Sequence, residues 1–278
     1  MPIVRPLGTM VVHAPPHLDI RVDLAIGRQL NATIVEILPD WKTCPDPVAL
    51  GRVIRNEGFR VHSVHGCWGS RTIEADRVDL ASTNPKVRAG SLADLTRCIE
   101  WVAAAGGTFL VVHPGGFSEQ SDFEGRRDVL KENLGNLGDF AENLGMILCV
   151  ENMPPGVYPG SRMADLANLV GELSHASLRL AIDTGHANMS GSASAETLAA
   201  GTWLATTHVH DNDGRRDIHS PPGFGTVDFV AWVRALDAIN YTGPIMLECI
   251  RQLRQDRSLI TDAFLEILRK LTGHSRGP

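Results

Sequence analysis

One stretch in the last third of the chain concentrates metal-binding side chains. Residues 208–219 read HVHDNDGRRDIH and contain three histidines and three aspartates. Imidazole and carboxylate ligands suit Mn, Mg, Zn or Fe, whereas a structural zinc site usually has thiolates. Strand residues two apart share a face, so His208 and His210 point the same way and Asp211 points to the other face. We therefore predict His208 as a metal ligand, His210 as a substrate contact and Asp211 as structural.

More carboxylates and imidazoles stand at or just beyond the ends of other apolar runs. These are Glu36, His65, His113, Glu151, Asp183, His186 and Glu248. Burying so many polar groups without compensation is costly, and a bound cation would offset that cost. His62 and His65 are three apart, so at most one faces inward in a regular strand. We expect His65 to face inward and His62 to pack against a helix.

The elements that would position these groups alternate between strand-like and helix-like patterns. The apolar runs are TMVVH, ATIVEIL, FRVHSVH, TFLVVH, MILCVE, LRLAID, LATTHVH and PIMLE. The clearest helical patterns span residues 18–30, 91–107, 128–145, 228–240 and 256–271, with Ser91 as an expected N-cap and Gly106-Gly107 as an end.

Strand followed by helix, repeated along the chain, predicts parallel strands with crossover helices. Eight such units fit one (β/α)8 barrel over residues 1–278, in which the strand ends meet at one mouth. A doubly wound open sheet is the alternative fold, but TMVVHAPPH lacks its phosphate-binding glycines.

Composition and charge narrow the class of protein. The formal net charge of -6 gives a nucleic-acid partner no general attraction. The five cysteines are odd in number and form no C-x-x-C pair, so we expect a reducing, cytoplasmic setting. The N-terminal segment has no long apolar core, and no apolar run reaches membrane-spanning length, so we expect no signal peptide and no membrane partner.

An ordered set of motifs resembles the xylose isomerase-like TIM-barrel superfamily, which includes sugar and sugar-phosphate isomerases and epimerases and endonuclease IV. The motifs are DLASTNPKVRAGSL, LVVHPGG, VEN, DTGHAN, HVHD, PPGFGTVDF and MLE, and the resemblance runs from about Thr33 to Leu271. For the epimerase-like members it implies one divalent metal held by Glu151, Asp183, His208 and Glu248. The two glutamates would move a proton on and off carbon through an enediolate, and His186 would contact the substrate.

The resemblance to endonuclease IV implies further ligands. They match His65, His113, His186, Asp217 and His219, which would raise the metal content from one to two or three zinc ions. The loops that follow the strands carry mixed charge rather than the basic residues that DNA binding needs. We therefore favour a sugar-like small molecule handled with Mn, Zn or Mg, and a nucleic-acid partner is disfavoured.

Several alternatives stay open at this point. A multinuclear zinc phosphoesterase acting on abasic DNA is the second hypothesis, and a lyase or dehydratase on the same scaffold is another. A non-catalytic barrel, or a subunit of a larger enzyme, ranks lowest. Around the mouth we expect Trp68, Glu36, His210 and Arg216 to contact the substrate. Barrels of this group often pair, so a homodimer is a further expectation.

Overall fold

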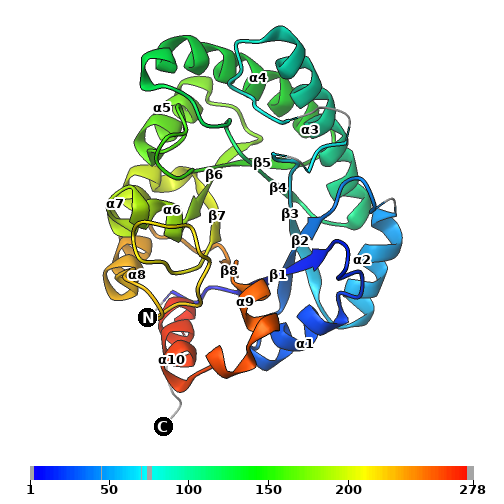
Figure 1. Ribbon diagram of the computed structural model, residues 1–278, viewed down its shortest axis with the longest axis vertical. Coiled ribbons are helices and arrows are strands. Elements are labelled where there is room, and N and C mark those ends of the chain that lie inside the picture. Colours follow the sequence, from blue (N-terminus) through cyan, green and yellow to red (C-terminus); the bar gives the residue numbers. More distant parts are fainter. Residues whose placement is uncertain (1–2, 45, 70, 74–76, 274–278) are drawn as a thin grey trace.

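The chain folds into a closed ring of parallel strands with helices on the outside (Figure 1). The computed structural model describes residues 3–44, 46–69, 71–73 and 77–273. Sheet neighbours follow the order β7-β6-β5-β4-β3-β2-β1-β8. The strands are β1 Leu7–His13, β2 Ile34–Pro39, β3 Arg60–His65, β4 Phe109–Val112, β5 Ile147–Glu151, β6 Leu178–Asp183, β7 Leu204–His208 and β8 Ile245–Leu247. The predicted (β/α)8 barrel is confirmed and the open sheet is excluded.

The two end strands close the barrel just beyond the regular ladder. Val209 donates its amide to the carbonyl of Met246 at 2.7 Å, and Glu248 donates to the carbonyl of Val209 at 3.0 Å. The hydroxyl of Thr207 also accepts from the Met246 amide at 3.0 Å and donates to the Pro244 carbonyl at 3.0 Å. Closure therefore brings the end of β7 beside the end of β8, where His208 and Glu248 lie.

Helices follow the strands, and most of them cover the outer face of the barrel (Figure 1). They are α1 Arg21–Gln29, α2 Pro47–Asn56, α3 Pro85–Ala105, α4 Phe123–Asn143, α5 Met163–Leu173, α6 Thr184–Met189, α7 Ala193–Ala200, α8 Phe229–Ala238, α9 Ile250–Gln255 and α10 Asp262–Thr272, with short 3-10 turns η1 Gln120–Asp122, η2 Gly201–Trp203 and η3 Arg257–Leu259. The strands are buried on both faces, as expected for parallel strands enclosed by helices.

Two helix predictions are wrong in detail. Helix α3 begins at Pro85, with Asn84 accepting the Lys86 amide as its N-cap, so Ser91 lies inside the helix. There the Ser91 hydroxyl donates to the Val87 carbonyl and accepts the Asp79 amide. The predicted helix 256–271 is interrupted after η3, because Thr261 is extended and caps α10 by accepting the amide of Phe264. The predicted end at Gly106 is confirmed by its left-handed φ of 86°.

The expectation for His62 is also wrong, because β3 is irregular. Pairing with β2 passes from Val35–Val61 to Glu36–Ser63, so the ladder skips His62. Its ring stacks on Phe109 of β4, at a centroid distance of 4.5 Å, rather than on a helix. Phe109 packs with Val111, which alternation places on the same side of β4 as His113. The irregularity lets both His62 and His65 approach the inside of the barrel.

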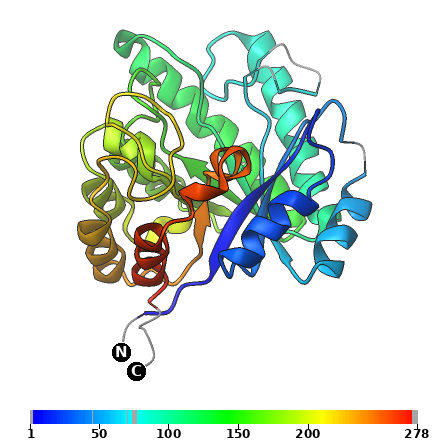
Figure 2. The same ribbon diagram turned by 60° about the horizontal axis from the view of Figure 1, so that its bottom comes forward.

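The loops at the carboxyl ends of the strands gather at one end of the molecule, above the sheet (Figure 2). At the other end the start of β1 meets the end of α10, and the Arg5 amide donates to the Thr272 carbonyl at 3.0 Å. None of the helices in the described part of the chain has the length and apolar character needed to cross a membrane. The site residues predicted from the sequence all come from the loop-bearing end.

Candidate metal centre

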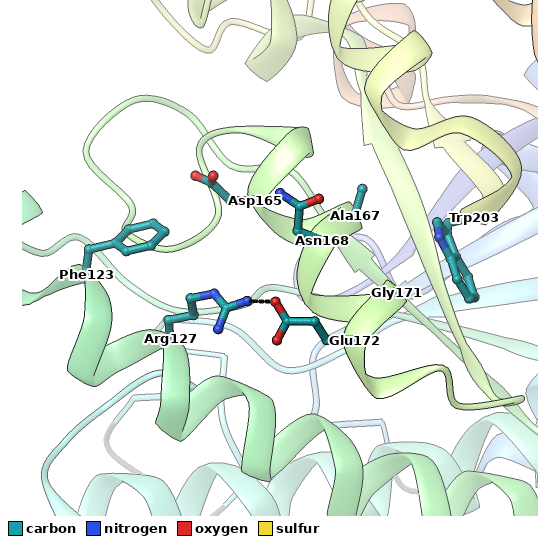
Figure 3. Close-up of a pocket in the computed structure, with 8 residues that line it drawn as sticks. All are labelled: Phe123, Arg127, Asp165, Ala167, Asn168, Gly171, Glu172 and Trp203. Carbon is teal, nitrogen blue, oxygen red and sulfur yellow. Dashed lines mark hydrogen bonds and ion pairs between the residues drawn. The ribbon is translucent and has the colours of Figure 1, made fainter.

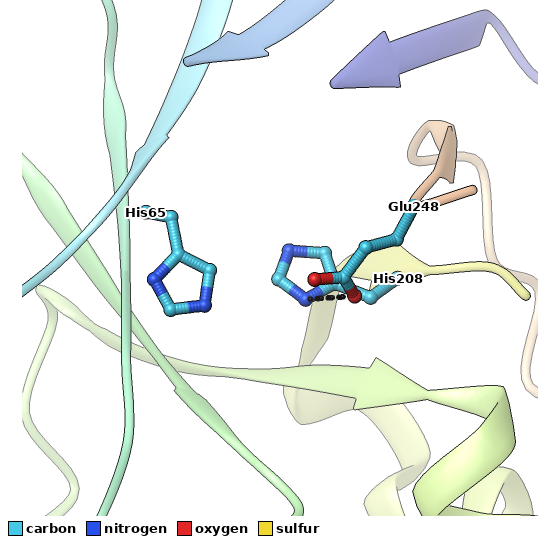
Figure 4. A group of neighbouring side chains, drawn as sticks. All are labelled: His65, His208 and Glu248. Atoms are coloured by element: carbon cyan, nitrogen blue, oxygen red, sulfur yellow. Dashed lines mark ion pairs between the residues drawn. The ribbon is translucent and has the colours of Figure 1, made fainter. Parts of the chain in front are cut away.

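His208, at the end of β7, lies at the centre of a buried group of carboxylates. Its Nδ1 is 3.0 Å from a Glu151 oxygen and 3.2 Å from a Glu248 oxygen. Its Nε2 is 2.7 Å from Glu36, whose other oxygen accepts the hydroxyl of Ser63 at 2.5 Å. Figure 4 shows His208 and Glu248 directed toward one another, with the ring of His65 beside them. The His208 side chain has no solvent exposure, so its ring is fixed on both edges.

Asp183 and His186 extend the group along β6 and α6. Asp183 accepts the His186 amide at 2.7 Å, which caps the start of α6. Asn152 donates to the Asp183 carbonyl and accepts the Asp183 amide, and its own carbonyl lies 2.9 Å from His186 Nδ1. The His186 Nδ1 atom is also 3.8 Å from Glu151. The end of β5 therefore holds the end of β6 in place.

His65 and His113 reach the opposite side of Glu151. The second oxygen of Glu151 lies 3.3 Å from His113 Nε2 and 3.7 Å from His65 Nε2. The two rings meet edge to face, with centroids 4.9 Å apart. His65 Nδ1 lies 3.0 Å from the carbonyl of Gly66, which leaves Nε2 directed toward Glu151. Both histidines therefore face the carboxylate cluster, as the sequence predicted for their strand ends.

Asp217 and His219 lie at the cluster, although they come from a loop. Asp217 is 3.3 Å from His186 Nε2 and 3.2 Å from His219 Nε2. His219 Nδ1 is 3.0 Å from the Glu248 carbonyl. His219 has a φ of 49°, a left-handed conformation that few residues other than glycine adopt. The loop holds His219 in this conformation with its ring stacked on His210, at a centroid distance of 4.1 Å.

The donor set fits a divalent cation. The Oε2 atoms of Glu151 and Glu248 are buried and make no hydrogen bond of good geometry to any described residue, although a histidine nitrogen lies within ion-pair distance of each. This arrangement is costly unless a cation or a better-placed donor meets the two oxygens. Glu151, Asp183, His208 and Glu248 each place one ligand atom within 4.8 Å of the others. The same holds for His65, His113 and Glu151, for His65, His208 and Glu248, and for His210, His219 and Glu248. Oxygen and imidazole ligands of this kind suit Mn, Zn or Fe.

The carboxylates also change the proton affinity of the histidines among them. Burial disfavours the charged ring of His186, but Asp183 and Asp217 outweigh this effect and raise its pKa to about 10. For His208, burial is likewise outweighed by Glu36 and Glu151, and its pKa rises well above the usual value. Protons and a metal ion would thus compete for the same negative charge.

Three of the four predicted substrate contacts are enclosed or paired with a neighbouring side chain. The Glu36 side chain is not exposed, and its two oxygens bond the Ser63 hydroxyl and the His208 ring. His210 is likewise enclosed, with Nε2 3.0 Å from Asp183. The Arg216 side chain is 73% exposed and pairs with Asp213 at 2.9 Å. Packing or a local ion pair occupies each of these groups, and their contact with a substrate stays a prediction.

Trp68 is the predicted contact that does line a cavity at the centre. This cavity has a volume of about 180 Å³ and is bounded by Trp68, Asp217, His219, Glu248 and Arg251 together with apolar side chains of β1, β2 and α9. The Trp68 ring lies 6.1 Å from that of His65 and 5.8 Å from that of His113. The cavity gives a small molecule access to Glu248, which is the least buried carboxylate of the four-residue group.

Sequence reasoning missed two residues that position the centre. Asn152 follows Glu151 directly in the ENM motif, and its place at a strand end is the signal that could have found it. Gly185 lies in DTGHAN, and a Cβ there would fall 1.9 Å from Cε1 of His210. Nothing in the local sequence reveals that contact, because the two residues meet only through the pairing of β6 with β7.

A separate hollow of about 560 Å³ lies on the outside of the barrel, where α4 faces α5 (Figure 3). Arg127 forms an ion pair with Glu172 across it, and Trp203 lies at its other side. The pairing neutralises both charges, and none of the candidate metal ligands of the centre lines this hollow. We do not connect it with the chemistry at the mouth.

Comparison with known proteins places the chain in a family. Residues 24–271 match the model of the xylose isomerase-like TIM barrel. The chain belongs to the xylose isomerase-like TIM barrel family. An uncharacterized protein of Methanocaldococcus jannaschii is 27% identical to it over 69% of this chain and 74% of that protein.

Two further members of this fold are named as epimerases. D-psicose 3-epimerase of Agrobacterium fabrum is 27% identical, and the match covers 61% of this chain and 60% of the relative. The crystal structure of a D-psicose 3-epimerase determined in the presence of D-fructose superposes with a TM-score of 0.74. That match has 17% identity and covers 96% of this chain and 99% of the other, so it supports the xylose isomerase-like fold.

Proposed function

We propose that this protein is a divalent-metal-dependent epimerase or isomerase of a keto sugar. The observation that carries the proposal is that Glu151 and Glu248 approach one nitrogen of His208, at 3.0 and 3.2 Å, beside a cavity that admits a small molecule. Two carboxylates at one site can remove a proton from carbon and return one. The match to a D-psicose 3-epimerase supports a sugar as the substrate.

The proposed role of each residue follows from its position in the site. Glu151, Asp183, His208 and Glu248 would hold the metal, which would supply positive charge beside the substrate carbonyl. Glu151 and Glu248 would carry out the proton transfers. His186 would orient a substrate oxygen from its place between Asn152 and Asp217. The apolar side chains of Met10, Val12 and Leu38 and the ring of Trp68 would limit water in the cavity.

Solvent exchange of the sugar's carbon-bound hydrogen tests the proposal. The protein, supplied with Mn, Mg or Zn, is incubated in D₂O with a panel of keto-hexoses and keto-pentoses, and deuterium at carbon is measured by NMR. Glu151→Gln and Glu248→Gln should each slow exchange by about 100-fold or more, since each removes an acid–base group. The exposed Glu119→Gln serves as a control of equal charge change.

No deuterium incorporation with any sugar and any of these metals would refute the proposal. A lyase or dehydratase would be recognised in the same samples by a product that has lost one water. An epimer with the mass of the substrate, apart from deuterium, is the expected product.

A second candidate function has an observation of its own. Asp217 and His219 lie at the centre rather than away from it, and His65 and His113 also reach Glu151. The four ligands of the one-metal site and the five further ligands that a multinuclear phosphoesterase would use therefore lie in one continuous cluster of side chains. Metal analysis separates the two functions: two or three zinc ions per chain with incision of abasic-site DNA would establish the phosphoesterase, and one ion per chain would exclude its multinuclear mechanism.

A further inference from the structure

A second cavity adjoins the one at the metal centre. It has a volume of about 390 Å³ and shares Val12 and Arg251 with the smaller cavity. Its lining includes three arginines and His17, and none of the described residues that line it is a carboxylate. A cavity lined by several guanidinium groups beside the candidate metal centre would suit an anion.

Arg71 is held against the mouth by Trp68. The guanidinium lies over the Trp68 ring, 5.0 Å from the centroid, and the Arg71 amide donates to the Trp68 carbonyl at 3.0 Å. Its Nη1 is buried and has no hydrogen-bond partner among the residues that the structure describes. Burial first, and then the nearby charge of Arg251, lower the pKa of Arg71, which indicates two like charges close together. A buried guanidinium donor without an acceptor is costly unless a ligand supplies one.

The other two arginines differ in their partners. Arg254 is committed to Asp23, to which its Nε donates at 2.8 Å, and Asp23 also accepts the Val12 amide. Arg251, on α9, has no carboxylate partner in the described part of the chain. Asp40, which favours the charge of Arg71, already accepts from the Lys42 amide and the Thr43 hydroxyl. Arg71 and Arg251 are therefore the two charges free to bind a ligand.

We propose that Arg71 and Arg251 bind a phosphate or carboxylate group at one end of the substrate, whose other end reaches the metal centre. The planar fork of guanidinium donors matches the oxygens of either group. Arg251 borders both cavities, so a molecule that spans them passes this residue. This inference rests on the proposed function, and it identifies the substrate as an anionic sugar rather than a neutral one.

Calorimetric titration of the metal-loaded protein with inorganic phosphate tests the site without turnover. Arg71→Gln and Arg251→Gln should each weaken phosphate binding by about 10- to 100-fold, the loss expected for a charged hydrogen-bond pair. Arg257→Gln is the matched control, because Arg257 is exposed in the same stretch of chain and hydrogen-bonds Gln29 outside the cavity. It should bind phosphate as the wild type does.

Phosphate could instead bind the metal itself. In that case Glu151→Gln would abolish binding while Arg71→Gln and Arg251→Gln left it unchanged, and the proposal would be overturned. If binding depends on the two arginines but no sugar exchanges deuterium, the anion site stands and the proton-transfer function fails. The two failures are thus distinguishable.

A comparison of three probes identifies the anion. D-fructose 6-phosphate carries a phosphate, 5-keto-D-gluconate carries a carboxylate, and D-fructose carries neither. Binding of either charged sugar should exceed that of D-fructose by at least about 10-fold and should fall in Arg251→Gln. The charged sugar that binds more tightly identifies whether the site prefers a phosphate or a carboxylate. Equal binding of all three sugars would contradict an anion-specific site.

Discussion

At the scale of single residues, the orientation of the His208 ring is the central feature. Its Nδ1 faces Glu151 and Glu248, and its Nε2 faces Glu36. A ligand that binds metal through one nitrogen usually donates the proton of its other nitrogen to a carboxylate, which fixes the ring and raises its basicity. Glu36 holds this position, and Ser63 in turn fixes Glu36. Glu36 is therefore a positioning residue for His208.

The substitution Glu36→Gln tests this role. A neutral amide in place of the carboxylate should lower the affinity for Mn or Zn by about 10- to 100-fold, since it weakens the bond that orients His208. Calorimetric titration of the metal-free protein measures the affinity. Glu119→Gln, an exposed change of the same type, should leave it unchanged. Unaltered metal affinity in Glu36→Gln would contradict the assigned role.

At the scale of elements, the close approach of α6 to the end of β7 requires a glycine. A Cβ at Gly185 would fall 1.9 Å from Cε1 and 2.6 Å from Nδ1 of His210. His210 cannot turn away easily, because it is buried between Asp183 and the ring of His219. Any side chain at position 185 therefore has to displace His210, α6 or both.

The substitution Gly185→Ala should destabilise the protein by about 1–3 kcal/mol, the usual range for overpacking, and should weaken metal binding. Gly171→Ala is the control, since a Cβ there meets only Trp203 Nε1 at 3.8 Å and favours the helix. Urea unfolding of both variants gives the comparison. Equal stability of Gly185→Ala and the wild type would show that α6 does not pack tightly against His210.

The burial of His62 in the irregular β3 strand predicts how the stability of the protein depends on pH. Burial lowers the pKa of His62 to about 4 from the model-peptide value of 6.5, so the native state favours the neutral ring. The contribution of the neutral His62 ring to the free energy of unfolding is fully present above pH 6.5, and it is lost as the pH falls toward 4. The loss from this one group is about 3 kcal/mol at most.

Substitution isolates that contribution. In His62→Phe and His62→Gln, the free energy of unfolding should fall less between pH 7 and pH 4 than in the wild type. Urea unfolding at each pH measures it, and the second variant guards against a poor fit of phenylalanine beside Phe109. The same pH dependence in all three proteins would rule out His62 as a source.

At the scale of the whole molecule, barrel closure concentrates negative charge that a cation would neutralise. Glu36, Glu151 and Asp183 are buried on β2, β5 and β6, and the partly buried Glu248 follows β8; all four lie in the group around His208. A ligand that binds only the native state stabilises it by about 2.7 kcal/mol at 100 times its Kd. Metal should therefore raise the unfolding temperature of the entire barrel.

Removal of the metal by chelation, followed by its return, tests whether metal binding stabilises the barrel. Addition of Mn or Zn at about 100 times its Kd to EDTA-treated protein should raise Tm by roughly 4–6 °C. The variant Glu151→Gln should show a much smaller rise, which separates the centre from weak surface binding. Identical melting with and without each metal would count against a metal centre.

The sequence alone was sufficient for the barrel and for much of its site. Seven of the eight apolar runs ended in polar residues, and parallel strands bring such ends together wherever the crossovers are right-handed and short. Thus Glu151, Asp183, His208 and Glu248 could be assigned to one mouth without coordinates, and the resemblance to the xylose isomerase-like superfamily singled them out as one ligand set. Local pattern also located Gly106 as a helix end, because a left-handed cap favours glycine.

Only the tertiary structure decided what depends on contacts between distant segments. The register shift of β3 turned His62 inward, the loop after β7 placed Asp217 and His219 at the centre, and packing enclosed Glu36 and His210. Arg71 and Arg251 are 180 positions apart by their numbers and share one cavity. Residue type predicts which groups can do chemistry, but loop conformation and strand register determine which of them meet.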